Sequence, residues 1–252
     1  MFCFPNSLVM ISKADMATDK KVIAFDLYGT LLSTESIAKQ LESHFPGKAQ
    51  SISSLWRRYQ LEYTWRLNSM GTFEPFSDIT RNALQHALAE HDESLPDDAI
   101  ASLMKAYDNL STFPDVQPIL TKLSKIPNLT AVVFSNGTQS MVSNSVNNSP
   151  DLAPHASVFK DIISVESIKA YKPAPAVYHH LIAKTGKSSA QKGDIYLVSG
   201  NPFDIVGARS VGLNAIWVDR GGRGWADAAV VELKPTAVVR SLEQIVEVIQ
   251  GT

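Results

Sequence analysis

The 252-residue sequence has little of what marks several classes of protein. Cys3 is its only cysteine, so the chain forms no internal disulfide and a disulfide-stapled secreted scaffold is excluded. No apolar run approaches the roughly 18 residues that a membrane span requires. Charged residues make up only 19%, and the net charge of −2 argues against nucleic acid or a membrane surface as partner. With 44% hydrophobic residues, the chain is expected to be a cytoplasmic globular protein.

The N-terminal stretch is expected to lie outside the fold. No basic residue precedes its apolar part and no clear small-residue cleavage site follows, so it makes a poor secretory signal. Met16 and a short polar segment come directly before the first strand pattern. We therefore assign residues 1–20 to an N-terminal extension, with a weak targeting segment as the alternative for the first 15.

Four short apolar runs are typical of buried strands that end at polar residues or glycine. These runs are residues 22–25, 129–134, 195–198 and 215–218. Helical patterns lie between or after them, at residues 115–124, 174–184, 203–211 and 242–249. Strands that alternate with helices predict an α/β fold with a Rossmann-like parallel sheet. Ligands of such sheets bind beyond the C-terminal ends of the strands, where the polar residues stand.

Residues 35–110 break this alternation, because they show helical periodicity without a convincing buried strand. We predict that they form a helical-bundle cap domain inserted after the first strand. Residues 21–34 and 111–252 then form the core domain. The polar stretch at residues 143–150 is expected to be a loop.

The residue that ends the first predicted strand is the first candidate for chemistry. Asp26 places an ionised carboxylate at the edge of a buried strand, which is costly unless something binds or uses it. Gly29 allows a tight loop after it, and Thr30 adds a hydroxyl. From these residues alone two interpretations stay open: Asp26 caps the next turn, or it reacts with a substrate.

Four motifs at strand ends or helix starts resemble those of the haloacid dehalogenase superfamily, in the superfamily's order. They are FDLYGTL at residues 25–31, SNG at 135–137, YKP at 171–173 and SGNPFD at 199–204. Each motif is weak alone, but the ordered set is specific. The resemblance runs from about Lys21 to the C-terminus and implies that superfamily's fold, a Rossmann-like core with a cap.

Two positions distinguish the sequence from the metal-dependent phosphatases of that superfamily. The phosphatases carry a second aspartate where this chain has Tyr28, and paired acids hold their metal where this chain has Asn201 and then Asp204. Because Mg²⁺ prefers carboxylate oxygens, we expect no metal, and we expect no other cofactor. The four motifs together resemble those of the L-2-haloacid dehalogenases.

The predicted cap contains a segment, residues 55–65, that resembles the one supplying the halide-facing arginine of those enzymes. Arg57, Leu61 and Trp65 are spaced at i, i+4 and i+8, so they share one stripe of a helix. Two interpretations of Arg57 stay open. Its guanidinium faces the active site, or it extends to solvent along a core-facing stripe.

The resemblance implies a two-step reaction that begins at Asp26. Its carboxylate would attack C2 of a 2-haloacid from the side opposite the halogen, giving an ester and a free halide. Arg57 and Asn136 would bind the departing halide. Ser135 and the backbone N–H groups near Leu27 and Tyr28 would bind the substrate carboxylate.

The remaining site residues are implied to act in ester hydrolysis or to surround the substrate. Asp204, with Ser199 and Asn201 in its loop, matches the group that orients the attacking water. Lys172 would hold two carboxylates ionised at close quarters. The other positions carried over are Thr30 and Tyr178 near these groups, and Leu27, Tyr28, Arg58, Leu61, Phe76 and Phe203 around the substrate.

Two of these positions depart from the family, which usually has tryptophan at Phe203 and often glutamine at Arg58. The resemblance implies hydrolysis of short (S)-2-haloalkanoic acids to (R)-2-hydroxy acids, with the haloacid, water and halide as partners. It allows a homodimer, a state common in the family. The alternatives are a Mg²⁺-dependent phosphatase and a catalytically silent binding protein on the same fold.

Overall fold

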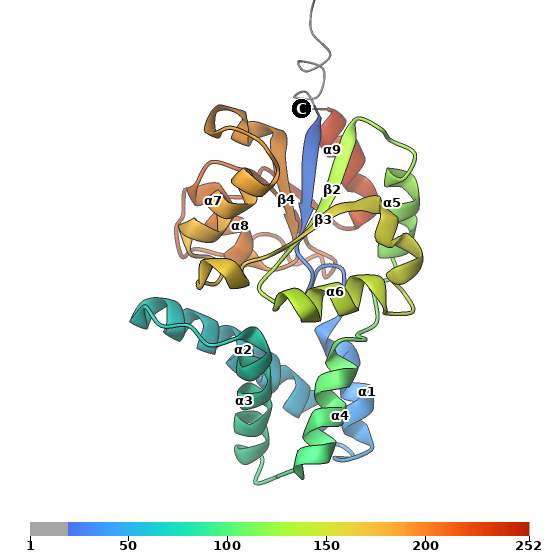
Figure 1. Ribbon diagram of the computed structural model, residues 1–252, viewed down its shortest axis with the longest axis vertical. Coiled ribbons are helices and arrows are strands. Elements are labelled where there is room, and N and C mark those ends of the chain that lie inside the picture. Colours follow the sequence, from blue (N-terminus) through green and yellow to red (C-terminus); the bar gives the residue numbers. More distant parts are fainter. Residues whose placement is uncertain (1–19, 252) are drawn as a thin grey trace, which may run out of the picture.

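The computed structural model describes residues 20–251, so all of the predicted extension except Lys20 lies outside the described residues. Figure 1 shows a sheet flanked by helices and a separate group of helices beyond one end of the strands. Among residues 20–251, every helix is too short or too polar to traverse a lipid bilayer.

The sheet has six parallel strands in the order β3-β2-β1-β4-β5-β6. Strand β1 therefore lies near the middle, and its residues Ile23 to Phe25 are fully buried, as expected for a parallel sheet that is covered on both faces. The strands are β1 (Lys21–Phe25), β2 (Leu129–Ser135), β3 (Phe159–Ser164), β4 (Ile195–Ser199), β5 (Asn214–Val218) and β6 (Ala237–Val239). The predicted α/β class with a parallel sheet is confirmed.

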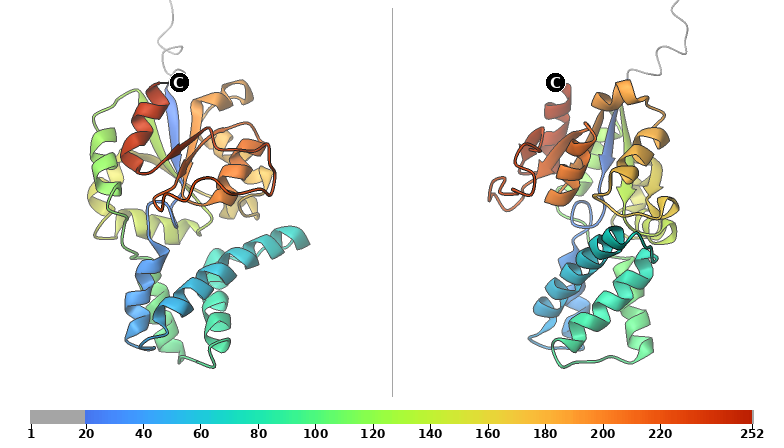
Figure 2. Two further views of the ribbon diagram at one scale, coloured as in Figure 1. Left: turned by 180° about the vertical axis from the view of Figure 1, so that it is seen from behind. Right: turned by 90° about the vertical axis from the view of Figure 1, so that its left-hand side faces the viewer.

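Helices cover both faces of the sheet. Helices α5 (Val116–Leu123) and α9 (Ile245–Gln250) lie on one side, and α7 (Pro175–Lys184) and α8 (Pro202–Ser210) lie on the other (Figures 1 and 2). Short 3-10 helices complete this part. They are η3 (Ala153–Val158), η4 (Glu166–Ile168), η5 (Ser189–Asp194) and η6 (Leu242–Gln244).

The sequence patterns missed two strands and one α-helix of this part. Both unpredicted strands are at the edges of the sheet: β3 exposes Lys160 and Asp161 in its middle, and β6 has only three residues, so neither shows a buried run. The prediction of a loop at residues 143–150 was wrong over its first half, because α6 covers Gln139–Asn147. The Thr138 side chain caps this helix by accepting from the Met141 N–H, and its apolar face is buried.

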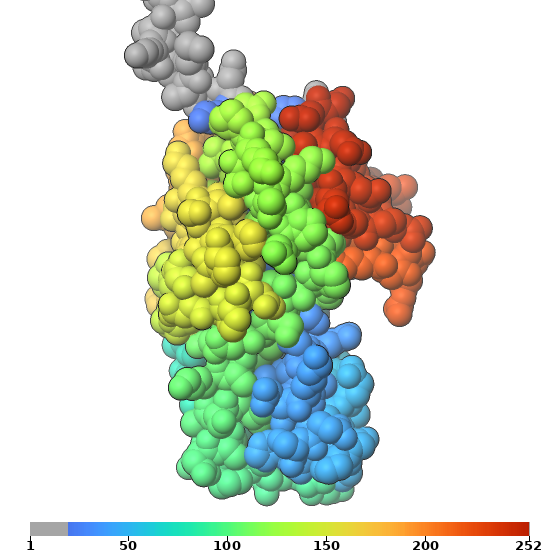
Figure 3. Space-filling view, turned by 90° about the vertical axis from the view of Figure 1, so that its right-hand side faces the viewer, coloured from blue at the N-terminus to red at the C-terminus, as the bar shows by residue number. Residues whose placement is uncertain are grey.

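The second group of helices, from η2 to α4, is called the cap here. Its members are η2 (Thr34–Ile37), α1 (Ala38–Glu42), α2 (Ala49–Met70), α3 (Phe76–Ala89) and α4 (Asp97–Tyr107). Two chain segments lead into and out of it side by side, joined by the Ser33 N–H to Ser111 O bond and the Phe113 N–H to Leu31 O bond. Figure 3 shows these segments, blue and green, adjacent at the junction with the sheet part.

Candidate active site

The loops after β1 and β4 bring Asp26 and a set of donors together. The Asp26 N–H continues the sheet by donating to Val198 O at 3.0 Å, so the carboxylate stands at the strand end, and its side chain is only 8% exposed. The loop after β4 passes very close to the loop after β1. A Cβ on Gly200 would lie 2.5 Å from Gly29 O, so this position requires glycine.

The two oxygens of the Asp26 carboxylate have unequal surroundings. Oδ2 accepts three hydrogen bonds, from Thr30 Oγ1 at 2.8 Å, Ser199 Oγ at 3.1 Å and Asn201 Nδ2 at 2.7 Å. Oδ1 accepts one bond, from Lys172 Nζ at 3.0 Å. The donors therefore fix the orientation of the carboxylate through Oδ2 and leave Oδ1 with lone-pair capacity to spare.

The Lys172 ammonium links two buried carboxylates. Its Nζ donates to Asp26, to Asp204 Oδ2 at 2.7 Å and to Phe134 O at 2.8 Å, which uses all three of its protons. The side chain of Lys172 is 1% exposed, and that of Asp204 is fully buried. An ion pair at such depth is stable only with all partners present, because each charge has lost its water.

Burial raises the pKa of Asp204 to about 6, and repulsion from Asp26 adds to this while Lys172 opposes it. The Tyr178 hydroxyl donates to Asp204 Oδ1 at 2.8 Å. Burial also raises the pKa of Tyr178, so the phenol stays a proton donor to the carboxylate. A carboxylate with a pKa near 6 is suited to act as a general base around neutral pH.

Asn201 has a fixed amide orientation, because its Nδ2 donates to two acceptors, Asp26 Oδ2 and Tyr28 O at 2.9 Å. The position beside Asp26 therefore presents N–H groups from Asn201 and an ammonium from Lys172. A Mg²⁺ ion needs oxygen ligands there. The donor set does not fit a dication bound at Asp26.

Arg57 reaches this site from helix α2 of the cap. Its guanidinium is half-buried and donates to Gln60 Oε1 at 2.6 Å and to Tyr28 O at 3.2 Å. This excludes the alternative in which Arg57 extends to solvent. A small pocket of about 10 Å³, roughly the space of one water molecule, is lined by Asp26, Tyr28, Arg57, Leu61, Phe76, Asn136, Lys172, Asn201 and Phe203.

Aromatic rings form the apolar wall of this pocket. Tyr28 stacks on Phe76 with ring centroids 5.9 Å apart, and Trp65 of α2 meets the edge of Phe203 at 5.6 Å. Phe203 belongs to the sheet part, so this last pair closes the pocket between cap and core. The wall keeps water away from a reaction at Asp26.

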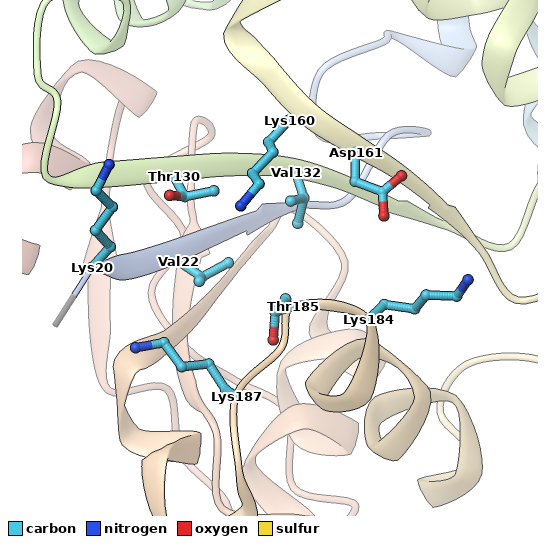
Figure 4. Close-up of a pocket in the computed structure, with 9 residues that line it drawn as sticks. All are labelled: Lys20, Val22, Thr130, Val132, Lys160, Asp161, Lys184, Thr185 and Lys187. Carbon is cyan, nitrogen blue, oxygen red and sulfur yellow. The ribbon is translucent and has the colours of Figure 1, made fainter. Parts of the chain in front are cut away.

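A larger hollow of about 170 Å³ lies at the opposite ends of the strands, far along β1 from Asp26. Figure 4 shows it between the starts of β1 and β2 and the end of α7. In this view the ammonium group of Lys160 points into the hollow, whereas those of Lys20, Lys184 and Lys187 point away from one another.

Comparison with known proteins identifies the family. A model of haloacid dehalogenase-like hydrolases matches residues 20–212. The (S)-2-haloacid dehalogenase H-109 of Pseudomonas putida is 34% identical over 223 residues, which make up 88% of this chain and 95% of that protein. The chain belongs to the (S)-2-haloacid dehalogenases, also called L-2-haloacid dehalogenases. The recognition made from the four motifs is confirmed.

Two further comparisons agree with this family assignment. The haloacetate dehalogenase H-2 of Moraxella sp. (strain B) is 34% identical over 202 residues, covering 80% of this chain and 87% of that protein. The structure of the L-2-haloacid dehalogenase from Xanthobacter autotrophicus with chloropropionic acid covalently bound matches with a TM-score of 0.81 at 27% identity. That match covers 92% of this chain and 99% of the other.

The dehalogenase structure brings most of the predicted site residues together around Asp26, either as hydrogen-bond partners or in the pocket wall. Asp204 and Tyr178 join this set through Lys172, which contacts both Asp26 and Asp204. Three other predicted residues place no side chain there. Leu27 is fully buried, and the Ser135 hydroxyl, also buried, accepts from the Gly137 N–H at 3.1 Å. The expectation that Arg58 contacts the substrate was wrong, because Arg58 is one residue after Arg57 on the helix and its side chain therefore points outward. Its side chain is 64% exposed and lies beside Glu90.

Two residues were not recognised as parts of the site from the sequence. Gln60 orients Arg57 and is held by the Tyr107 hydroxyl at 3.0 Å and by its own bond to Thr80. Its position three residues after Arg57 on a helix was the available signal. Asn68, eleven residues after Arg57, returns to nearly the same helix face, and it contacts the loop before Lys172.

Proposed function

We propose that this protein hydrolyses short (S)-2-haloalkanoic acids to (R)-2-hydroxy acids through an ester of Asp26, releasing halide without a metal. The observation that carries the proposal is the Asp26 carboxylate, held by three donors at Oδ2 and facing an apolar pocket that contains the Arg57 guanidinium. A phosphatase would need a second acid at Tyr28 and a metal at Asn201, and neither residue can serve.

In the first step, Asp26 Oδ1 attacks C2 of the substrate. The Oδ1–C2 bond forms while the C2–halogen bond breaks, and the halide leaves with the bonding electrons, which inverts C2. Oδ1 is the oxygen with lone pairs to spare, whereas Oδ2 is occupied by its three donors. Lys172 and Thr30 keep the carboxylate oriented during the attack.

The departing halide needs cationic and amide donors on the far side of C2. Arg57 supplies the cation once its guanidinium breaks the hydrogen bond to Tyr28 O and donates to the halide instead. Asn136 supplies the amide, since its Oδ1 is occupied by the Lys172 N–H at 2.9 Å and its Nδ2 is left for the pocket. We assign the substrate carboxylate to the backbone N–H groups at Leu27 and Tyr28. The Ser135 hydroxyl, which is buried and outside the pocket wall in this structure, would have to turn toward the substrate to join them.

In the second step, water attacks Cγ of the Asp26 ester. Negative charge then develops on Oδ2, where Thr30, Ser199 and Asn201 already donate and act as an oxyanion hole. Asp204 takes the proton of the water. The Cγ–Oδ1 bond then breaks, the departing alkoxide takes the proton held by Asp204, and the second proton of the water leaves as the Asp26 carboxylate re-forms. The hydroxyl oxygen of the product therefore comes from Asp26, and an oxygen from water replaces it.

The pocket limits the substrate to a small acid. A free space of about 10 Å³ holds no haloacid, so the side chains at the mouth, Arg57 first among them, must move when the substrate enters. The apolar wall of Tyr28, Leu61 and Phe76 suits a hydrogen or methyl group on C2. We expect acids of two or three carbons to be preferred.

The domain division, the cellular compartment and the oligomeric state are also proposed. We propose that residues 35–110 act as a cap domain over the core of residues 21–34 and 111–252. We further propose a cytoplasmic enzyme that works as a homodimer, with neither nucleic acid nor a membrane as partner. Equilibrium sedimentation of the purified chain tests the dimer.

An ion-selective halide assay tests the reaction. We expect chloride from (S)-2-chloropropionate but not from the (R) enantiomer, at the same rate with and without EDTA. Asp26→Asn should abolish release, and the matched control Asp98→Asn, at an exposed helix position, should leave it unchanged. Halide release that persists in Asp26→Asn, or Mg²⁺-dependent phosphate release from phosphate esters by the wild type, would falsify the proposal.

A further inference from the structure

One side chain at the end of helix α2 makes a pair of hydrogen bonds to the loop that carries Lys172. Asn68 Nδ2 donates to Tyr171 O at 2.7 Å, and the Tyr171 N–H donates to Asn68 Oδ1 at 2.9 Å. A single amide thus pairs with both backbone groups of one residue, which fixes the distance and the direction of approach between α2 and the loop. We call this pair of bonds the clasp.

The side chain of Tyr171 extends the clasp into the cap. Its ring is buried and stacks on Phe73 with centroids 5.2 Å apart and an interplanar angle of 17°. Its hydroxyl donates to Glu74 O in the connection between α2 and α3. A residue of the core is therefore enclosed by the chain segment that follows α2, on the side of the cap nearest Lys172.

Lys172 does not depend on the clasp for its own position. Its N–H is held by Asn136, and its Nζ is held by Asp26, Asp204 and Phe134 O, all from the core. The element that the clasp positions is therefore α2, whose last turns also contact the core through the edge of the Trp65 ring against Phe203.

Helix α2 also carries Arg57, eleven residues before Asn68. At 100° and 1.5 Å per residue the two side chains lie on the same face, about 20° and roughly 16 Å apart. The direct bond of Arg57 to the core, to Tyr28 O, is 3.2 Å long. Arg57 gives up this bond when it turns to the halide, and the clasp then holds the helix in place.

We propose that Asn68 is a positioning residue, which locks α2 onto the core through Tyr171 so that Arg57 is in register with the departing halide. This inference rests on the proposed function, because it assigns Asn68 to the halide-release step. Asn68 touches neither the substrate nor the Asp26 carboxylate, so it acts through Arg57.

The test combines a double-mutant cycle with amide exchange. Chloride release from (S)-2-chloropropionate is measured in single turnovers for the wild type, Asn68→Ala, Arg57→Lys and the double variant, with Ser69→Ala, an exposed neighbour, as control. Asn68→Ala should lower the rate about 10- to 100-fold in the wild-type background. In the Arg57→Lys background, Asn68→Ala should lower the rate by less than about twofold. The control Ser69→Ala should leave the rate unchanged.

Residue-resolved hydrogen exchange provides a readout that does not need activity. In Asn68→Ala the Tyr171 amide should lose protection, while the Lys172 amide, held by Asn136, should keep it. Equal losses of rate in both backgrounds, or unchanged protection at Tyr171, overturn the proposal. Wild-type protein that releases no halide overturns the proposed function instead, and the exchange experiment still decides whether the clasp exists.

Discussion

Removing the Lys172 ammonium is the perturbation whose consequence follows most directly from the geometry. In Lys172→Met, Asp26 and the fully buried Asp204 face each other without the cation that contacts them at 3.0 and 2.7 Å. Removing one partner of a buried ion pair typically costs about 3–5 kcal/mol of the free energy of unfolding, because the remaining charge is uncompensated.

The penalty should depend on pH. Lys172 lowers the pKa of Asp204, so its loss raises that pKa above about 6. A carboxyl group with a raised native pKa binds its proton in the folded state only, and stability then falls as the pH rises through the native pKa. In the variant, the free energy of unfolding should keep falling above pH 6, by about 1.4 kcal/mol per pH unit, until the pH reaches the raised pKa of Asp204. In the wild type this fall ends near pH 6. Their difference should widen by up to about 3 kcal/mol between pH 6 and pH 8.

Urea unfolding curves at pH 6, 7 and 8 measure this difference. Lys48→Met is the matched control, because the Lys48–Glu93 pair is exposed and contributes at most about 1 kcal/mol. Adding Asp204→Asn to Lys172→Met should restore part of the stability at pH 8. A penalty of equal size at all three pH values would mean that the lysine acts by packing alone, and the electrostatic reasoning would be refuted.

Three further predictions concern single sites. Because ester hydrolysis needs ionised Asp204, kcat should fall about tenfold per pH unit below about pH 6, and a flat profile down to pH 5 would contradict its role as base. Gly207→Ala would place a Cβ against the Tyr178 hydroxyl and 2.6 Å from its Cζ, so we expect a loss of about 1–3 kcal/mol in thermal unfolding and a lower kcat; unchanged values would contradict the contact. Arg58→Ala should leave kcat and KM within about twofold in steady-state assays, since its side chain faces solvent.

The centre of the fold could be predicted from the sequence because local pattern and environment coincide there. Strands β1 and β4 are buried on both faces and therefore appear as continuous apolar runs, and their ends carry Asp26 and Ser199. Parallel strands bring these ends to one edge of the sheet. The order of the motifs therefore predicted that Asp26 and Ser199 lie close together. The edge strands β3 and β6 lack such runs and left no comparable signal.

Residues that act between cap and core were harder to predict. Helical periodicity puts Arg57 and Leu61 on one face, but it does not say which core atoms that face meets. Resemblance to the family suggested a substrate contact for Arg58, although its helix position directs it outward. Asn68 belongs to no motif, and its role depends on a backbone segment 103 residues away.

The source of the product's hydroxyl oxygen tests the central claim, that Asp26 attacks carbon and water attacks Asp26. Enzyme in excess over (S)-2-chloropropionate is allowed one turnover in H₂¹⁸O. The masses of the lactate and of the peptide that contains Asp26 are then measured by mass spectrometry. We expect unlabelled lactate and one ¹⁸O atom in the Asp26 carboxylate. Labelled lactate from an unlabelled enzyme would contradict this claim, because water would then have attacked C2 directly.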